Sequence, residues 1–238
     1  MPGKLIGREV IITFYGHAAF KLSGHGATVV IDPWLSNPLL TTPVSQVGAV
    51  DAILVTHGHG DHVGETVSLA QATGAQVVAI HELSQILASQ GAPKVIGMNK
   101  GGTVTLNGLR ITMTTAVHSS TAEVGGQTVS AGDPGGFVVT FPNGFTVYHA
   151  GDTAVFKDME LIQELYHPEV ALLPIGSHYV MNPKEAALAC RLLKPRFVIP
   201  MHYGTFPVLT GTPEELKTLL KDQPATQVLS LKPGETVE

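Results

Sequence analysis

The run from His57 to His62, with the sequence His-Gly-His-Gly-Asp-His, is the feature that most constrains this chain. It follows an apolar segment, 52–56, that reads as a strand, and a helix is expected to begin at residues 63–65. Glycines between the polar residues allow a tight turn that aims His57 and His59 at one point and Asp61 and His62 at a neighbouring one. A turn that holds histidines by chance would leave several polar groups near a core without partners, so we interpret the run as metal-binding.

Three more ligand-type residues, His118, Asp152 and His202, each come just after the C-terminal end of a predicted strand. Side chains at strand ends can converge on one cleft. Two metal ions about 3.5 to 4 Å apart need a bridging carboxylate and further histidines beyond one short motif. Imidazole and carboxylate ligands suit zinc most simply, with manganese or iron as alternatives. The sequence therefore predicts a site for two divalent metal ions.

Composition excludes several classes of protein. The formal charge is −5 and there is no lysine or arginine run, which argues against a nucleic-acid partner. No apolar stretch approaches the roughly 18 to 20 residues of a membrane helix, and no signal peptide is recognisable in residues 1–9. We therefore expect a soluble, cytoplasmic protein with no membrane partner. The single cysteine, Cys190, excludes an internal disulfide and is expected to be a buried, inert thiol.

The order of predicted elements indicates an α/β protein. Strands are expected at 10–15, 19–22, 28–32, 52–56, 76–80, 103–106, 109–115, 136–141, 145–149, 170–174, 197–200 and 227–231. Helices are expected at 65–73, 82–90, 159–166, 184–193 and 213–221. Two similar halves predict a sandwich of two sheets with helices on both outer faces, and no linker divides residues 1–238, so we expect one domain. The long segment 119–135, rich in Ser, Gly and Thr, is a candidate lid.

The ligand-type residues also carry a resemblance. His-x-His-x-Asp-His, a later single His, a Gly-Asp and a last His, in that order, resemble the metallo-β-lactamase superfamily over residues 57–202. The segments 15–20, 31–34 and 200–207 make the chain similar, more narrowly, to the ascorbate-6-phosphate lactonase-like branch of metal-dependent hydrolases. The resemblance implies a four-layer αββα sandwich, the architecture that the element order also favours. It implies one metal held by His57, His59 and His118, a second held by Asp61, His62 and His202, and Asp152 bridging both.

Such a site predicts hydrolysis by a metal-bridging hydroxide, because the pKa of a water between two divalent ions falls from near 16 toward roughly 7. Asp61 and Asp152, as carboxylate ligands, are expected to orient this hydroxide. The expected substrate is a small-molecule ester, lactone or phosphoester. His178 follows a strand end and is the candidate for a substrate-binding group, an oxyanion stabiliser or a general acid, with orientation of a metal ligand as the alternative role.

The remaining histidines and Asp32 are not predicted to bind metal. His17 has the same two alternatives as His178, and Asp32 is expected to form a turn or to hydrogen-bond a ligand rather than bind metal. His149 is expected to pack inside the protein. We expect surface positions for His25, His81 and His167.

Three other functions compete with hydrolysis of a small molecule. An iron-dependent oxidoreductase could use the same scaffold, although a Glu in place of His59 would have favoured it. A nuclease or phosphodiesterase would use similar metal chemistry, but the charge of −5 counts against it. A metal-stabilised binding protein without turnover is disfavoured, since seven ligands shared by two ions leave positions for water. The sequence does not decide between a monomer and a homo-oligomer.

Overall fold

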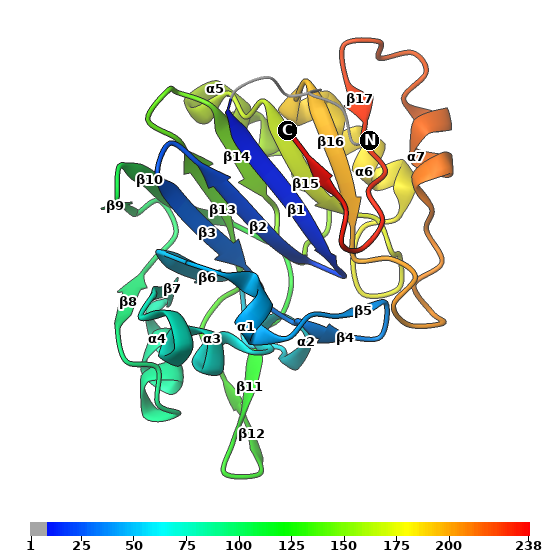
Figure 1. Cartoon of the computed structure of the whole chain (residues 1–238). Helices are drawn as coiled ribbons and strands as arrows, with labels where there is room; N and C mark the ends of the chain where they lie inside the picture. The colour runs from blue at the N-terminus through cyan, green and yellow to red at the C-terminus, as the bar shows by residue number, and fades with distance from the viewer. Residues whose placement is uncertain (1–8) are drawn as a thin grey trace.

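Two mixed β-sheets of seven strands each form the centre of the molecule (Figure 1). The computed structural model describes residues 9–238, so residues 1–8, on which the prediction about a signal peptide depends, lie outside the described part. The first sheet has the order β18 (Thr236–Val237), β1 (Val10–Gly16), β2 (Ala19–Gly24), β3 (Ala27–Ile31), β6 (Ala52–Val55), β7 (Gln76–Ile80) and β8 (Val95–Met98). The second has the order β17 (Gln227–Val228), β16 (Phe197–Met201), β15 (Val170–Pro174), β14 (Thr146–His149), β13 (Gly135–Thr140), β10 (Leu109–Thr115) and β9 (Thr103–Leu106).

Each sheet is antiparallel in one half and parallel in the other. In the first sheet β3, β6, β7 and β8 run parallel, and in the second β14, β15, β16 and β17 do. Parallel strands end at the same edge of a sheet, and loops beyond those ends can converge on one site. The two parallel halves therefore each provide an edge for functional residues.

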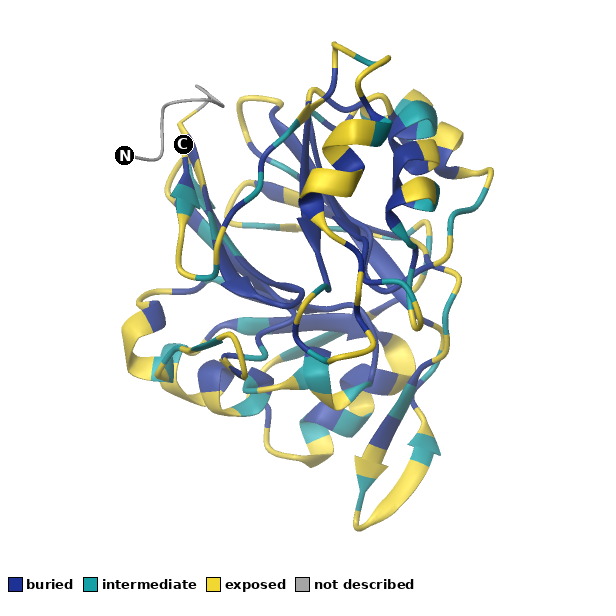
Figure 2. Ribbon diagram, turned by 90° about the vertical axis from the view of Figure 1, so that its right-hand side faces the viewer, coloured by how far each residue is buried: buried dark blue, intermediate teal, exposed yellow. Residues whose placement is uncertain are grey.

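Helices cover the outer faces of the two sheets, which gives the predicted αββα layers. The helices are α1 (Val44–Val47), α2 (Gly60–Val63), α3 (Thr66–Thr73), α4 (His81–Ser89), α5 (Met159–Tyr166), α6 (Pro183–Leu193) and α7 (Pro213–Leu219). Helices α3 and α4 contact strands of the first sheet, whereas α6 and α7 contact β15 and β17 of the second. Buried residues are concentrated in the sheets and exposed ones on the outer helix faces (Figure 2). None of these helices, within residues 9–238, is long and apolar enough to span a membrane.

Successive residues of β15 face opposite sides of the second sheet and so belong to two different cores. Val170 and Leu172 belong to the core between the two sheets, whereas Ala171 and Leu173 belong to the core beneath helices α5 to α7. Both sets are fully buried, because this strand is covered on both faces. Cys190 of α6 lies in the second core as a free thiol, which confirms its predicted burial, and burial raises its pKa to about 12, which disfavours the reactive thiolate.

The sequence placed most elements correctly but missed a hairpin. Residues 119–135 do not form one open loop, because β11 (Thr121–Val124) and β12 (Gln127–Ser130) pair within them. The turn between them is Gly125-Gly126, and both residues have positive φ, as a two-residue hairpin turn requires. This Gly-Gly signal was present in the sequence. The hairpin projects away from the two sheets (Figure 1). The short strand β8 and the two-residue strands β4 (Ser36–Asn37) and β5 (Leu40–Thr41) were also missed.

Candidate metal centre

The ligand-type residues of the sequence meet at the edge formed by the ends of the parallel strands. Their nitrogen and carboxylate oxygen atoms form three overlapping groups, within each of which all ligand atoms lie within 4.8 Å of one another. The groups are His57, His59 and His118; His57, His62 and Asp152; and His17, Asp61, His62 and His202. The structure thus brings together all seven predicted metal ligands and adds His17.

Asp152 lies between the groups. Its Oδ2 atom is 3.0 Å from the Nε2 atom of His202, 3.3 Å from that of His62, 3.7 Å from that of His118 and 3.9 Å from that of His57. The side chain is 3% exposed. One carboxylate therefore faces imidazoles of both halves of the site, which is the position that the resemblance implies for a bridging ligand.

Unsatisfied buried atoms show that this donor set fits metal ions. Among residues 9–238, the atoms His62 Nε2, Asp152 Oδ1 and both ring nitrogens of His202 are buried and make no hydrogen bond. Buried polar atoms normally have partners, because leaving one unpaired costs about 1–3 kcal/mol. Imidazole nitrogens around a carboxylate are a donor set that suits zinc, manganese or iron.

Asp32 sets the orientation of two of these histidines. Its Oδ2 atom accepts hydrogen bonds from His62 Nδ1 at 2.8 Å and from the Thr56 hydroxyl at 2.7 Å. Since the Thr56 hydroxyl donates to Asp32, its oxygen accepts from His57 Nδ1 at 3.0 Å. When neutral, both histidine rings therefore carry their proton on Nδ1 and leave the lone pair of Nε2 for a metal ion. Asp32 therefore holds the rings of these two predicted ligands through hydrogen bonds, which is one of the two roles that the sequence left open.

In the group formed by His57, His59 and His118, electrostatics favour neutral imidazole rings. Burial lowers the pKa of His57, His59 and His118, and neighbouring histidines contribute to the shift. Burial acts to lower the pKa of His62 as well, but the carboxylates of Asp152 and Asp32 raise it well above its ordinary value. The carboxylates around His62, above all Asp152, therefore favour a positive charge at this position. Since a histidine binds metal in its neutral form, a metal ion can supply that charge in place of the proton.

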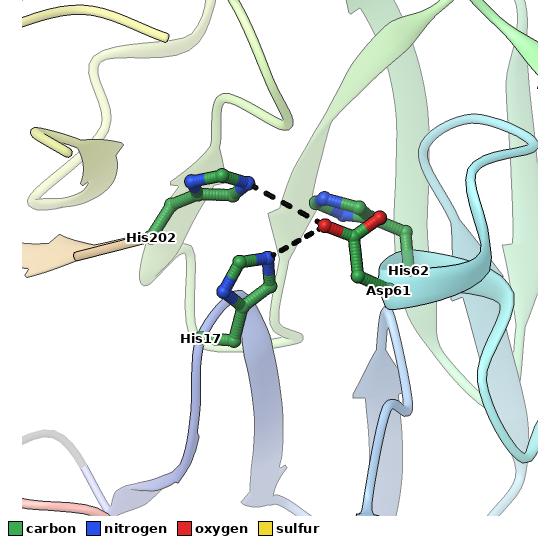
Figure 3. A group of neighbouring side chains, drawn as sticks. All are labelled: His17, Asp61, His62 and His202. Atoms are coloured by element: carbon green, nitrogen blue, oxygen red, sulfur yellow. Dashed lines mark hydrogen bonds and ion pairs between the residues drawn. The ribbon is translucent and has the colours of Figure 1, made fainter. Parts of the chain in front are cut away.

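His17 joins the second group from the turn between β1 and β2. Figure 3 shows its ring beside His202 with Nε2 directed at Asp61. The distance from His17 Nε2 to Asp61 Oδ2 is 3.1 Å, and the distance from His17 Nδ1 to the Thr205 hydroxyl is 2.8 Å. Burial lowers the pKa of His17 to about 4. A neutral His17 must donate from Nε2, because an ionised carboxylate only accepts, and so Nδ1 accepts from Thr205.

The hydroxyl of Thr205 is therefore expected to control how His17 holds Asp61. In Thr205→Val the buried Nδ1 of His17 loses its donor, and we expect metal affinity at this group to fall about 10- to 100-fold. Thr205→Ser keeps the hydroxyl and should stay close to the parent protein. Competition with a chelating dye measures both affinities. Equal affinity in the two variants would contradict this role.

Backbone strain marks the same edge of the molecule. His17, Asp32 and His202 have φ values of +55°, +47° and +55°. This left-handed region costs a non-glycine residue on the order of 1–3 kcal/mol and is enriched at functional sites. The backbone oxygen of His17 accepts from the His202 amide at 2.7 Å, which fastens the first sheet to the second.

His178 does not reach the cavity beside this site. The cavity has a volume of about 300 Å³ and is lined by His59, Asp61, His118, Ser119, Asp152, Tyr179 and His202. His178 is exposed and packs against the ring of Tyr179, which is itself 57% exposed. Ser177 and His178 both have positive φ, and this turn places Tyr179 rather than His178 on the cavity wall. Sequence analysis had not singled out Tyr179 or Ser119.

The other histidines lie where the sequence placed them. His25, His81 and His167 are exposed. His149 is fully buried, and its Nε2 donates to the backbone oxygen of Ala18 at 2.9 Å while its Nδ1 accepts from the Gly151 amide at 3.1 Å. His149 therefore supports the turn that carries Asp152.

The buried His149 predicts a loss of stability in acid. Burial lowers its pKa, so below a pH of about 6.5 the unfolded chain binds a proton that the folded chain does not. The stability of the metal-free protein should fall by up to about 1.4 kcal/mol per pH unit through this group, down to the folded-state pKa. Urea unfolding between pH 5 and 7 measures the slope. We expect a shallower slope in His149→Gln, and an unchanged slope would refute the assignment.

Gly58 has no room for a side chain, whereas Gly60 does. A Cβ atom on Gly58 would lie 2.6 Å from the Cβ of Ala131 and 2.7 Å from the backbone oxygen of Thr121. A Cβ atom on Gly60 would meet nothing within 4 Å. We expect Gly58→Ala to destabilise the protein by about 1–3 kcal/mol by pushing the hairpin away from the metal-ligand loop. Gly60→Ala should stay within about 0.5 kcal/mol of the parent in urea unfolding. Equal free energies of unfolding for Gly58→Ala and Gly60→Ala would show that the hairpin can move aside without a loss of stability.

Comparison with known proteins agrees with this geometry. A family model described as the beta-lactamase superfamily domain matches residues 27–203, which is more than half of the chain. Fold and site together define a member of the metallo-β-lactamase superfamily.

Comparison with individual proteins shows which family within this superfamily the chain belongs to. A UPF0173 metal-dependent hydrolase from Chloroflexus aurantiacus is 47% identical over 98% of both chains, and one from Rubrobacter xylanophilus is 50% identical over 94% of both. A metallo hydrolase of known structure, Igni18 from Ignicoccus hospitalis, is 40% identical, with a TM-score of 0.87 over 96% of this chain and 97% of its own. The chain belongs to the UPF0173 metal-dependent hydrolase family. The narrower resemblance to the ascorbate-6-phosphate lactonase branch stays a prediction.

Proposed function

We propose that this protein is a dinuclear metal-dependent hydrolase of a small-molecule ester, lactone or phosphoester. His57, His59 and His118 would hold one divalent ion, and Asp61, His62 and His202 a second. The position of Asp152, with Oδ2 within 4 Å of four imidazole nitrogens from both groups, is the observation that carries the proposal. Zinc is the proposed metal, with manganese or iron as alternatives.

When bound, two divalent ions acidify a water and polarise the substrate oxygen. The protein contributes orientation and charge. Asp32 and Thr56 hold the rings of His57 and His62, and His17 holds Asp61. Burial acts to raise the pKa of Asp61, but the hydrogen bond from His17 and the nearby imidazoles lower it well below the usual range. Asp61 is therefore ionised at neutral pH and can orient a water molecule by accepting a hydrogen bond from it.

Tyr179 is the proposed substrate contact in place of His178. It lines the same cavity as the ligand-type residues and carries a hydroxyl that can donate a hydrogen bond to a substrate oxygen. His178 can support it only through the ring contact, whose centroid distance is 4.4 Å.

Metal analysis and a substrate screen test the proposal together. Protein loaded with zinc or manganese should bind two ions per chain and hydrolyse at least one ester, lactone or phosphoester in a broad panel. Stoichiometric iron with oxygen-dependent turnover and no hydrolysis would favour an oxidoreductase instead. Metal binding without turnover on any bond type would favour a binding protein.

A further inference from the structure

A second cavity lies next to the metal centre and is apolar. It has a volume of about 330 Å³ and lies between α4, the metal-ligand loop and strand β11. Its apolar walls are made by Val63, Leu83, Ile86, Leu87 and Ala122. Leu83 and Leu87 are fully buried, whereas Ile86 and Val63 are half-buried. The volume falls at the lower end of the range typical of small-ligand pockets, roughly 300 to 1,000 Å³.

His59 is shared by the walls of the two cavities. It lines the apolar cavity and also the cavity that contains Asp61, Asp152 and Tyr179. A molecule whose reacting group lies beside Asp152 therefore has the apolar cavity on the other side of His59. The two spaces together offer one polar end for chemistry and one apolar end for binding.

The walls of the apolar cavity select an uncharged occupant. Among the described residues that line it, Glu123 is the one acidic side chain, and it is exposed at the solvent side. No Lys or Arg is among those lining residues, so nothing in them would neutralise a phosphate or carboxylate. Burying an unpaired charge there would be costly, whereas burying hydrocarbon gains free energy.

The hairpin that closes the cavity is fastened at two points. The amide of Gly58 donates to the Ser120 hydroxyl at 3.1 Å, and Gln90 Nε2 donates to the backbone oxygen of Glu123 at 3.2 Å. Gly58 also packs against Thr121 and Ala131 without space for a Cβ atom. These contacts hold β11 against the metal-ligand loop and α4, so the cavity is preformed.

We propose that this cavity is the subsite for a hydrocarbon chain of the substrate, so that the protein acts on esters or lactones with an alkyl or acyl group. This inference rests on the proposed hydrolase function. It predicts that recognition away from the metal ions depends on apolar length, with each buried methylene improving binding about fourfold.

Calorimetric titration of the zinc-loaded protein with acetate, butanoate, hexanoate and octanoate tests the subsite without requiring turnover. These carboxylates resemble products of ester hydrolysis, and the dissociation constant should fall about fourfold per methylene until the cavity is full. In Ile86→Trp the new ring fills the cavity, and octanoate should bind no better than acetate. Ile86→Ala, which enlarges the cavity, should extend the chain length at which affinity stops rising.

Leu188→Trp is the matched control, because Leu188 is a helix residue of α6 that is 46% exposed and does not line this cavity. It should keep the chain-length dependence of the parent. Equal affinity from acetate to octanoate, absence of binding by all four, or a dependence that survives in Ile86→Trp would overturn the subsite. A protein that hydrolyses no ester, lactone or phosphoester would overturn the proposed function, and the titration would still decide whether the cavity accepts a hydrocarbon chain.

Discussion

Asp152→Ala should reduce hydrolysis by at least about a thousandfold and lower the metal content from two ions per chain to one or none. The buried carboxylate faces imidazoles of both halves of the site, at 3.0 to 3.9 Å. A correctly held metal pair lowers the activation free energy by several kcal/mol through charge stabilisation in the transition state. Each 1.36 kcal/mol that is lost slows the reaction about tenfold. Elemental analysis and kcat/KM on a substrate from the screen measure the two effects.

Asp133→Ala is the control for this substitution. Asp133 also forms an ion pair, with Lys100 at 2.7 Å, but its side chain is 72% exposed. Its removal should leave both the metal content and the stability of the protein close to those of the parent. Asp152→Asn keeps the shape of the side chain while removing its charge, and we expect it to resemble Asp152→Ala. Two bound ions with near-parental activity in Asp152→Ala would disprove the bridging role.

Removal of metal should lower the melting temperature by roughly 5 to 10 °C. Ions present at 100 times their dissociation constant stabilise the folded state by about 2.7 kcal/mol, and each kcal/mol shifts the melting temperature of a chain of this size by about 2–4 °C. The physical cause lies in buried ligand-type atoms that lack hydrogen bonds, such as Asp152 Oδ1. Without metal, these groups have lost their hydration and have no partner in its place.

Thermal melts with and without a chelator measure this difference. The chelator effect should be small in Asp152→Ala, which has little metal to lose, and should persist in Asp133→Ala. An identical melting temperature for the metal-loaded and chelated parent protein would show that the site contributes nothing to folding.

Local sequence spacing predicted the metal-ligand loop well. The pattern His-Gly-His-Gly-Asp-His after an apolar strand is short-range, and the structure places His57 and His59 in one group of ligand-type atoms and Asp61 and His62 in a neighbouring one. The strand-end residues His118, Asp152 and His202 could also be found, because parallel strands of one sheet end at the same edge. Short, nearly continuous apolar runs predicted the strands at 76–80 and 170–174 with their exact bounds.

The roles of His17 and His178 could not be separated from the sequence, since both follow predicted strands. His17 bonds Thr205, 188 residues away, through contact between the turn after β1 and the loop after β16. His178 lies on the exposed side because Ser177 and His178 both adopt positive φ, although neither is glycine. Such strained conformations persist where surrounding packing enforces them, so a residue list does not reveal them.

The local pattern from His57 to His62, together with the order of strands and helices, was enough to determine an αββα fold with a metal site at the strand ends. Chemistry of the ligand types and strand periodicity act over a few residues, and both can be read along the chain. Contacts between loops and helices far apart in the sequence decided the rest: Asp32 holding the rings of His57 and His62, His17 holding Asp61, and an apolar cavity beside His59. These features depend on atoms that meet across tens to hundreds of residues, and only folding brings them together.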